Sequence, residues 1–225
     1  MKFALTFFCL FLSINLVAQD SLALAEKSYK EDQWYAGISF LLADESIEGF
    51  RLNGVSQSFS IGFIKDISLN NKSNRALGIG LGYGINNYGS NLSISIENND
   101  SYGFSLVESI RLVSKNRLVS HFLEVPIEFR WRTSTATTYK FWRIYSGYLL
   151  RYNFFSRIKP FYDPARVINE VNPISHALKF STGYNTWNIY FEYSLTPFFK
   201  TGTQTNLGTP LELNAIRAGL VFYVL

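Results

Sequence analysis

Apolar and polar residues alternate along much of this chain, most clearly in residues 120–132. Successive side chains of a β-strand point to opposite sides, so one face of this segment is apolar and carries Leu123, Val125, Ile127, Phe129 and Trp131. The other face is charged and carries Glu124, Glu128, Arg130 and Arg132. A soluble sandwich would bury the apolar face. A transmembrane barrel would turn the apolar face to lipid and the charges to its interior.

The same period of two predicts seven further strands. They are residues 34–42, 57–66, 75–87, 139–152, 176–184, 187–194 and 213–225. Residues 88–116 contain two more alternating pieces, at 91–96 and 102–113. We interpret this region as the tall outer end of a hairpin, which leaves a barrel of eight strands. If both pieces cross the membrane, the barrel has ten strands.

The connections between the predicted strands alternate between long and short. The long ones are residues 43–56, 88–116, 153–173 and 195–212, and brief polar turns lie between them. Outer-membrane barrels have long external loops and short periplasmic turns, whereas a soluble sandwich has no reason to sort its loops in this way. We therefore predict an all-β fold, an antiparallel up-and-down transmembrane β-barrel over residues 34–225 with both termini in the periplasm.

Residues 1–19 differ from the rest of the chain, because a basic start is followed by an apolar run and then by small residues. This order is typical of a cleaved secretory signal peptide. We predict cleavage after Gln19, with Ala18 as the neighbouring option, and a short periplasmic lead-in over residues 20–33. The alternative, an uncleaved anchor helix, is disfavoured because polar residues interrupt an already short apolar stretch.

The composition suits a membrane barrel and argues against other classes. The chain has 20 Phe and 14 Tyr but a single Met, as lipid-facing strands with aromatic girdles require. Its only cysteine, Cys9, lies in the predicted signal peptide, so we expect no disulfide in the mature fold. The formal net charge is +4, and the lysines and arginines are scattered among the acidic residues along the chain. Nucleic-acid binding normally needs a concentrated basic patch, so we expect no nucleic-acid partner.

Eight charged residues face the barrel interior in this arrangement and form a candidate lumen charge network. They are Glu124, Glu128, Arg130, Arg132, Arg143, Lys179, Glu192 and Arg217. They could line an ion or substrate path, or they could form salt bridges that fill a closed lumen. A barrel of about eight strands has little free interior, which favours the closed lumen. The expected partners of the two glutamates at 124 and 128 are Arg143, Lys179 and Arg217.

Two features of the predicted strands bear on the backbone. Pro126 faces inward and cannot donate a ladder hydrogen bond, so we expect a β-bulge or a local bend there. Residues 78–84 have glycine at every second position, which does not match the Gly-x-Gly-x-x-Gly fingerprint of dinucleotide binding. The spacing instead places these glycines on the inner face, where a narrow barrel must make room for long side chains.

No motif in the sequence predicts catalysis, a cofactor or a bound metal. The two histidines, His121 and His176, have lipid-facing parity near the outer rim. Some small outer-membrane barrels modify lipid A with a histidine, a serine and an acid, but neither histidine sits in a His-x-Ser arrangement with an acid at matching height. Two distant histidines without cysteine do not make a zinc site. A lipid-modifying enzyme is therefore a disfavoured alternative to a non-enzymatic protein.

Residues 120–132 and 139–148 resemble the PorT-like outer-membrane β-barrel proteins of the Bacteroidetes. The resemblance rests on the Leu-Glu-Val-Pro-Ile core, on the basic aromatic strand that follows it, and on Gly-Leu-Gly-Tyr at residues 80–83. It implies an outer-membrane location and a non-enzymatic role. The founding member is needed for the type IX secretion system, so the resemblance also implies a part in protein secretion and gliding.

Three functions are consistent with the sequence. The first is a structural or accessory barrel of the envelope, with the type IX secretion system as its implied setting. The second is a narrow passive channel, and the third is the lipid-modifying enzyme. The expected partners are outer-membrane lipid and, through the long exposed loops at 88–116 and 153–173, other envelope or secretion-system proteins.

Overall fold

The computed structural model describes residues 32–43, 47, 49–52, 55–96, 102–107, 116–133, 142–160 and 164–224. Its strands are β1 (Gln33–Ala43), β2 (Gln57–Ser68), β3 (Arg75–Gly89), β4 (Leu92–Ile96), β5 (Tyr102–Leu106), β6 (Arg117–Arg132), β7 (Trp142–Lys159), β8 (Arg166–Val167), β9 (Ile174–Tyr184), β10 (Trp187–Ser194) and β11 (Ala215–Val224). The predicted signal peptide and most of the predicted lead-in lie outside these residues. In the described part of the chain, no helix is long and apolar enough to cross a membrane.

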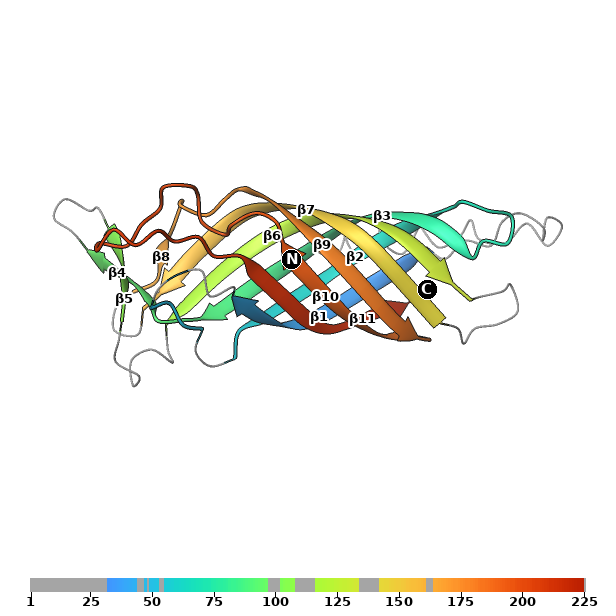
Figure 1. Ribbon diagram of the computed structural model, residues 1–225, viewed down its shortest axis with the longest axis horizontal. Coiled ribbons are helices and arrows are strands. Elements are labelled where there is room, and N and C mark those ends of the chain that lie inside the picture. The colour runs from blue at the N-terminus through green and yellow to red at the C-terminus, as the bar shows by residue number, and fades with distance from the viewer. Residues whose placement is uncertain are drawn as a thin grey trace, which may run out of the picture.

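Eight of the strands close into an antiparallel barrel (Figure 1). Each barrel strand pairs with the next one along the chain, and β11 pairs with β1 to close the ring, with Trp34 opposite Val224. β4 and β5 form a separate two-stranded sheet, and β8 pairs with the far end of β7. The predicted barrel is therefore confirmed with eight strands, because the two pieces between β3 and β6 do not join its wall.

The two ends of the barrel differ. The turns that join β2 to β3 and β9 to β10 lie at one end, which we call the short-turn end. The connections that carry β4, β5 and β8 lie at the other, the long-loop end, which is on the left in Figure 1. In outer-membrane barrels the long connections face the exterior.

The barrel wall is apolar on its outer surface and polar inside. Leu81 and Trp187 are each 62% exposed, whereas Glu128 is 1% exposed. Water-soluble monomers rarely expose a continuous apolar belt, because such a surface is favourable in contact with lipid and not with water. The alternation that predicted the strands therefore reflects a surface that faces a bilayer.

All four tryptophans lie at the short-turn end. Trp34 and Trp187 are at the starts of β1 and β10, while Trp131 is near the end of β6 and Trp142 begins β7. Their ring partners include Phe63 for Trp34 and Phe222 for Trp187, at centroid distances of 5.4 and 4.7 Å. Tryptophan is enriched where a membrane meets water, so this belt marks one edge of the bilayer.

β6 and β7 are longer than the sequence predicted. β6 begins at Arg117, and β7 continues to Lys159 through residues that were expected to be loop. The prediction failed because the pairing of β6 with β7 shifts by one residue between His121 and Phe122. The shift interrupts the alternation of exposed and buried residues in β7, with Phe154 exposed and the next residue half-buried. The alternation in the sequence therefore stops before the strand itself ends.

Of the two features predicted at Pro126, a β-bulge or a local bend, the β-bulge is wrong. Pro126 lies opposite Leu149 of β7 in an unshifted register. On the β3 side the register is the same before and after the proline, but Val125 and Pro126 have no paired residue there. The missing N–H of Pro126 therefore interrupts the pairing with β3 locally, but no extra residue is inserted into the strand. The bulge occurs four residues away, at the shift described above.

A hydrophobic core lies at the long-loop end, and we call it the apolar cap. Its buried members are Leu41, Ile47, Tyr88, Leu92, Ile94, Phe104, Leu118, Ile158, Ile168, Val171, Phe198, Phe199, Leu211, Leu213 and Ala215. They come from the inward-facing ends of five barrel strands, from β4 and β5, and from the long connections. Phe198 packs edge-on against Phe199 and Tyr88, at centroid distances of 5.1 and 5.3 Å. The cap therefore spans the mouth of the barrel.

Candidate functional site: the charged barrel interior

The structure places all eight residues of the candidate lumen charge network inside the barrel. Glu124, Glu128, Arg130, Arg132, Arg143, Lys179, Glu192 and Arg217 are each between 0% and 9% exposed. Two further charged residues, Asp66 and Arg151, are buried among them at 1% and 5%. These two were not among the predicted interior charges, although each shares inward parity with interior residues of its strand, Ser58 for Asp66 and Arg143 for Arg151.

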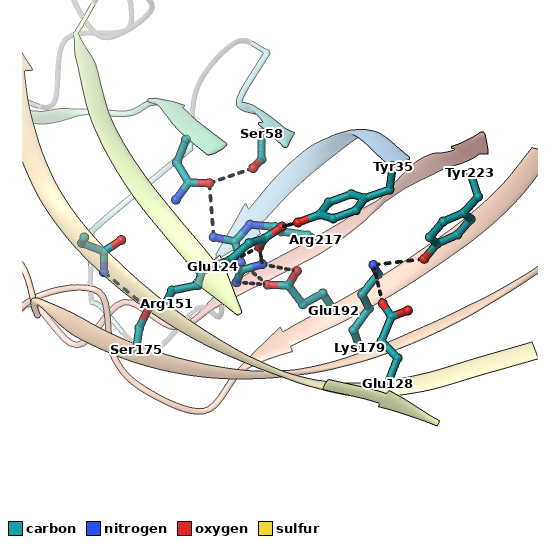
Figure 2. A network of polar contacts seen from close by, with 12 residues as sticks. Tyr35, Ser58, Glu124, Glu128, Arg151, Ser175, Lys179, Glu192, Arg217 and Tyr223 are labelled. Atoms are coloured by element: carbon teal, nitrogen blue, oxygen red, sulfur yellow. Dashed lines mark hydrogen bonds and ion pairs between the residues drawn. The ribbon is translucent and has the colours of Figure 1, made fainter. Parts of the chain in front are cut away.

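The first of three groups of contacts centres on Glu192, which accepts hydrogen bonds from two arginines (Figure 2). Arg151 makes a bidentate pair with Glu192, at 2.5 and 2.7 Å between its two terminal nitrogens and the two carboxylate oxygens. Arg217 donates to Glu192 from β11 and, through its other terminal nitrogen, to Asn86 Oδ1 at 3.2 Å. Charge-assisted bidentate pairs of this kind are among the strongest hydrogen bonds in proteins.

Glu124 connects this group to the opposite wall. Arg151 Nε donates to Glu124 Oε2 at 3.0 Å, so one guanidinium joins two carboxylates. The hydroxyl of Tyr35 on β1 donates to Glu124 Oε1 at 2.8 Å. The contact crosses the lumen, because β1 is not a neighbour of β6 in the sheet. Residues from β1, β3, β6, β7, β10 and β11 are thereby joined in one network.

The second group surrounds Lys179. Its ammonium donates to Glu128 Oε1 at 3.0 Å and to the hydroxyl of Tyr223 at 3.4 Å, as Figure 2 shows. The rings of Tyr35, Tyr190 and Tyr223 lie 5.5–5.9 Å from the same nitrogen. Cation–π attraction strengthens when the cation is desolvated, so the three rings replace water around this charge.

The third group lies towards the short-turn end. Arg130 and Arg132 both donate to Asp66. Arg130 also donates to Gln33 Oε1 at 2.5 Å, and Arg132 Nε donates to the carbonyl oxygen of Ser73 at 3.1 Å. These contacts tie the turn between β2 and β3 to β6, which closes the interior at this end with charged side chains.

The predicted partners differ in part from those observed. Lys179 contacts Glu128, as expected. Arg217 pairs with Glu192 instead of Glu124. The position beside Glu124 is occupied by Arg151, which was not among the predicted interior charges. Arg143 donates to the carbonyl oxygen of Asn185 in the turn between β9 and β10, at 2.6 Å. Partner choice depends on the register around the whole ring, which the alternation within single strands does not encode.

Little space remains around these side chains. A cavity of about 10 Å³ borders Glu124, Arg151, Glu192 and Arg217, which is about the volume needed for one water molecule. The ring of Phe122 lies against Arg151, at 4.9 Å from its guanidinium carbon, on the side of the apolar cap. Inner-face glycines accommodate this crowding, since a Cβ at Gly82 would lie 1.9 Å from the hydroxyl oxygen of Tyr35.

Both histidines lie on the outer surface of the barrel. His121 Nδ1 hydrogen-bonds to the hydroxyl of Tyr83 at 2.7 Å, and His176 makes the same contact with Tyr148. In both pairs the tyrosine comes from the neighbouring strand. Among the residues that the structure describes, no three His, Cys, Asp or Glu side chains are grouped as metal ligands would be.

The sequence was compared with known proteins and families. A search of curated proteins gave no match. The family model described as outer membrane protein beta-barrel domain matches residues 18–200, which is most of the chain. A closed eight-stranded wall, a lipid-facing apolar belt and a polar interior are what such a domain requires. The chain therefore belongs to the outer membrane protein beta-barrel domain family and is located in the outer membrane.

Proposed function

We propose that this protein is a closed, non-enzymatic barrel with a structural or accessory role in the outer membrane. The observation that carries the proposal is the interior network centred on Glu192, Arg151 and Glu124, which leaves room for about one water molecule. A conducting pore needs a continuous aqueous path, whereas these charges neutralise one another across the lumen. The apolar cap adds a second barrier, because ions would have to leave water to cross it.

The alternative function is a narrow passive channel. The purified protein in planar lipid bilayers separates the two, with a known porin in the same bilayers as the control for detection. We expect no stable unit openings from the closed barrel under conditions in which the porin conducts. Stable openings would establish the channel and remove the closed-lumen proposal.

A lipid-modifying enzyme is the third possibility, and it receives the least support. His121 and His176 bond to tyrosines on the lipid-facing surface, and among the described residues no ion pair joins either of them to an acid. Mass spectrometry of lipid A from a deletion strain and its parent tests this directly. We expect identical lipid A species, and a species missing from the deletion strain would contradict the non-enzymatic role.

We further propose that the accessory role is in the type IX secretion system. The support is the resemblance of residues 120–132 and 139–148 to PorT-like proteins. Deletion of the gene should reduce export of cargo proteins that carry type IX sorting signals, and the wild-type gene should restore it. Unchanged export in the deletion strain would remove this role and leave the closed barrel unaffected.

A cleaved signal peptide over residues 1–19 remains part of the proposal. N-terminal sequencing of protein purified from outer membranes should begin at Asp20 or, for the neighbouring site, at Gln19. A sequence that begins at Met1 would support the uncleaved anchor instead.

A further inference from the structure

The two faces of the barrel wall differ in charge: acids occur only on the inner face, together with six buried bases, whereas the outer face carries bases alone. The acids all face the lumen and are Asp66, Glu124, Glu128 and Glu192. The charges on the outer face are all basic and lie near the ends of the strands, and they are Lys65, Arg75, Arg117, Arg157 and Lys159. The outer surface therefore carries positive charge at both edges of the apolar belt.

Three of these cations gather at the long-loop end of β6 and β7, and we call them the outer basic cluster. Arg117 lies opposite Lys159, and Arg157 lies opposite Val119 two residues along. Arg117 is held by a hydrogen bond of 3.0 Å from Nη1 to the carbonyl oxygen of Val55, which leaves its other donors for a ligand. No ion pair joins the three cations to an acid in the described part of the chain.

An aromatic group lies directly below the cluster on the same outer face. Tyr83, His121 and Phe154 have ring centroids 6.1–6.4 Å apart. Phe155 of β7 lies opposite His121 of β6. Towards the long-loop end, Arg157 is two residues from Phe155 and Arg117 is four residues from His121. With a strand rise near 3.3 Å and a tilt of about 40°, the cations lie about 5–10 Å farther along the barrel axis.

We propose that the outer basic cluster binds the phosphate groups of lipopolysaccharide in the outer leaflet, while the aromatic group contacts its acyl chains. Aromatic side chains of mixed polarity mark the level at which a bilayer meets water. Cations about 5–10 Å above that level are at the height of lipid headgroups, and basic side chains there attract anionic lipid. Arginine is suited to this role, because its guanidinium can make bidentate bonds to phosphate.

The position on the wall argues for a lipid over a soluble anion or an acidic protein segment. The three cations project from the outward faces of β6 and β7, in line with residues that contact acyl chains, and not from the tip of a loop. A glycolipid with phosphates and acyl chains can satisfy both groups of side chains at once. Inorganic phosphate could satisfy the cations alone.

The test is binding of hexa-acylated, bisphosphorylated Kdo2–lipid A to the purified full-length protein in detergent micelles, measured by native mass spectrometry. The triple variant Arg117→Gln, Arg157→Gln, Lys159→Gln is compared with wild type, and Lys65→Gln, Arg75→Gln at the opposite edge is the matched control. Each cation at a lipid surface contributes roughly fivefold in affinity, so the triple variant should bind about 100-fold more weakly and the control as wild type. Heat-modifiability on gels checks that every variant is folded.

Two further measurements use only the wild-type protein, so they do not depend on whether the variant folds. They show whether the bound anion is the phosphate of a lipid or a free phosphate. Wild type should lose most of its affinity for Kdo2–lipid A from which both phosphates have been removed, and its affinity for the intact lipid should fall as salt is raised. Pyrophosphate at millimolar concentration should compete poorly, because it lacks acyl chains. Equal binding by the triple variant, equal binding of the dephosphorylated lipid, or efficient competition by pyrophosphate would each overturn the assignment.

Discussion

Glu192 in the barrel and Phe199 in the apolar cap are both 1% exposed, yet they belong to interiors of opposite character. The barrel surrounds its buried charges with opposite charges and tyrosine rings, and it turns most of its apolar residues outward, because lipid contacts its outer surface. The cap packs apolar side chains together, because the connections that form it extend beyond the membrane into water. The chain therefore has a charged interior and an apolar interior next to each other. The boundary between them lies near Phe122, whose ring contacts Arg151 on the side of the apolar cap.

The largest predicted effect is on the barrel interior. Glu192→Ala leaves Arg151 and Arg217 without their shared carboxylate, and breaking a buried ion pair costs about 3–5 kcal/mol. We expect urea unfolding in micelles, followed by tryptophan fluorescence, to show this loss. Lys72→Ala, at an exposed residue of the turn between β2 and β3, is the control and should change the free energy of unfolding little. Equal stability of the two variants would mean that the network is not a structural element.

The cap should respond to loss of apolar volume instead. Phe199 packs against Phe198 and Phe104, and truncation of a buried phenylalanine costs about 3–5 kcal/mol. We expect Phe199→Ala to loosen the cap locally, so that protease cleaves the long connections faster while the barrel still migrates as a folded species on unheated gels. Loss of the folded barrel band would show that cap and barrel unfold as one unit.

On the lipid-facing surface, the exposed fraction of a residue does not predict whether a charged substitution is tolerated. Leu81 is 62% exposed, and a soluble protein would accept arginine there with little effect. In a bilayer, Leu81→Arg should cost about 2–4 kcal/mol in the free energy of unfolding, measured in lipid vesicles. Leu207→Arg, at a residue 94% exposed in the β10–β11 connection, should be nearly neutral. A neutral result at Leu81 would place this face outside the hydrocarbon region.

A smaller effect is expected where glycine makes room in the lumen. A methyl group at Gly82 would collide with the hydroxyl of Tyr35 and push it away from Glu124. Overpacking of this kind costs about 1–3 kcal/mol. Gly82→Ala combined with Tyr35→Phe should recover part of the loss, because the colliding oxygen is removed, and urea unfolding of both variants measures this. No recovery would mean that backbone strain, and not the hydroxyl, sets the cost.

Much of the barrel could be predicted from local pattern. Alternation located all eight strands, and parity placed Glu124, Lys179 and Arg217 on the inner face, because each depends only on neighbouring residues. Longer-range features could not be derived. The partner of Arg217 depends on where β10 meets β11, and the cap joins segments as distant as Leu41 and Leu213. Residues 91–96 also have the alternation of a membrane strand, and only the pairing of β4 with β5 shows that they lie outside the wall.

The claim that the lumen is filled is tested most directly by the accessibility of a single thiol inside it. Ser39 faces the interior at 3% exposure, while Thr201 is an exposed residue of the β10–β11 connection. In a Cys9→Ser background, each is changed to cysteine and treated with a small methanethiosulfonate reagent in lipid vesicles. We predict rapid labelling at position 201 and labelling at position 39 only after unfolding. Comparable rates at the two positions in the folded protein would contradict a closed interior.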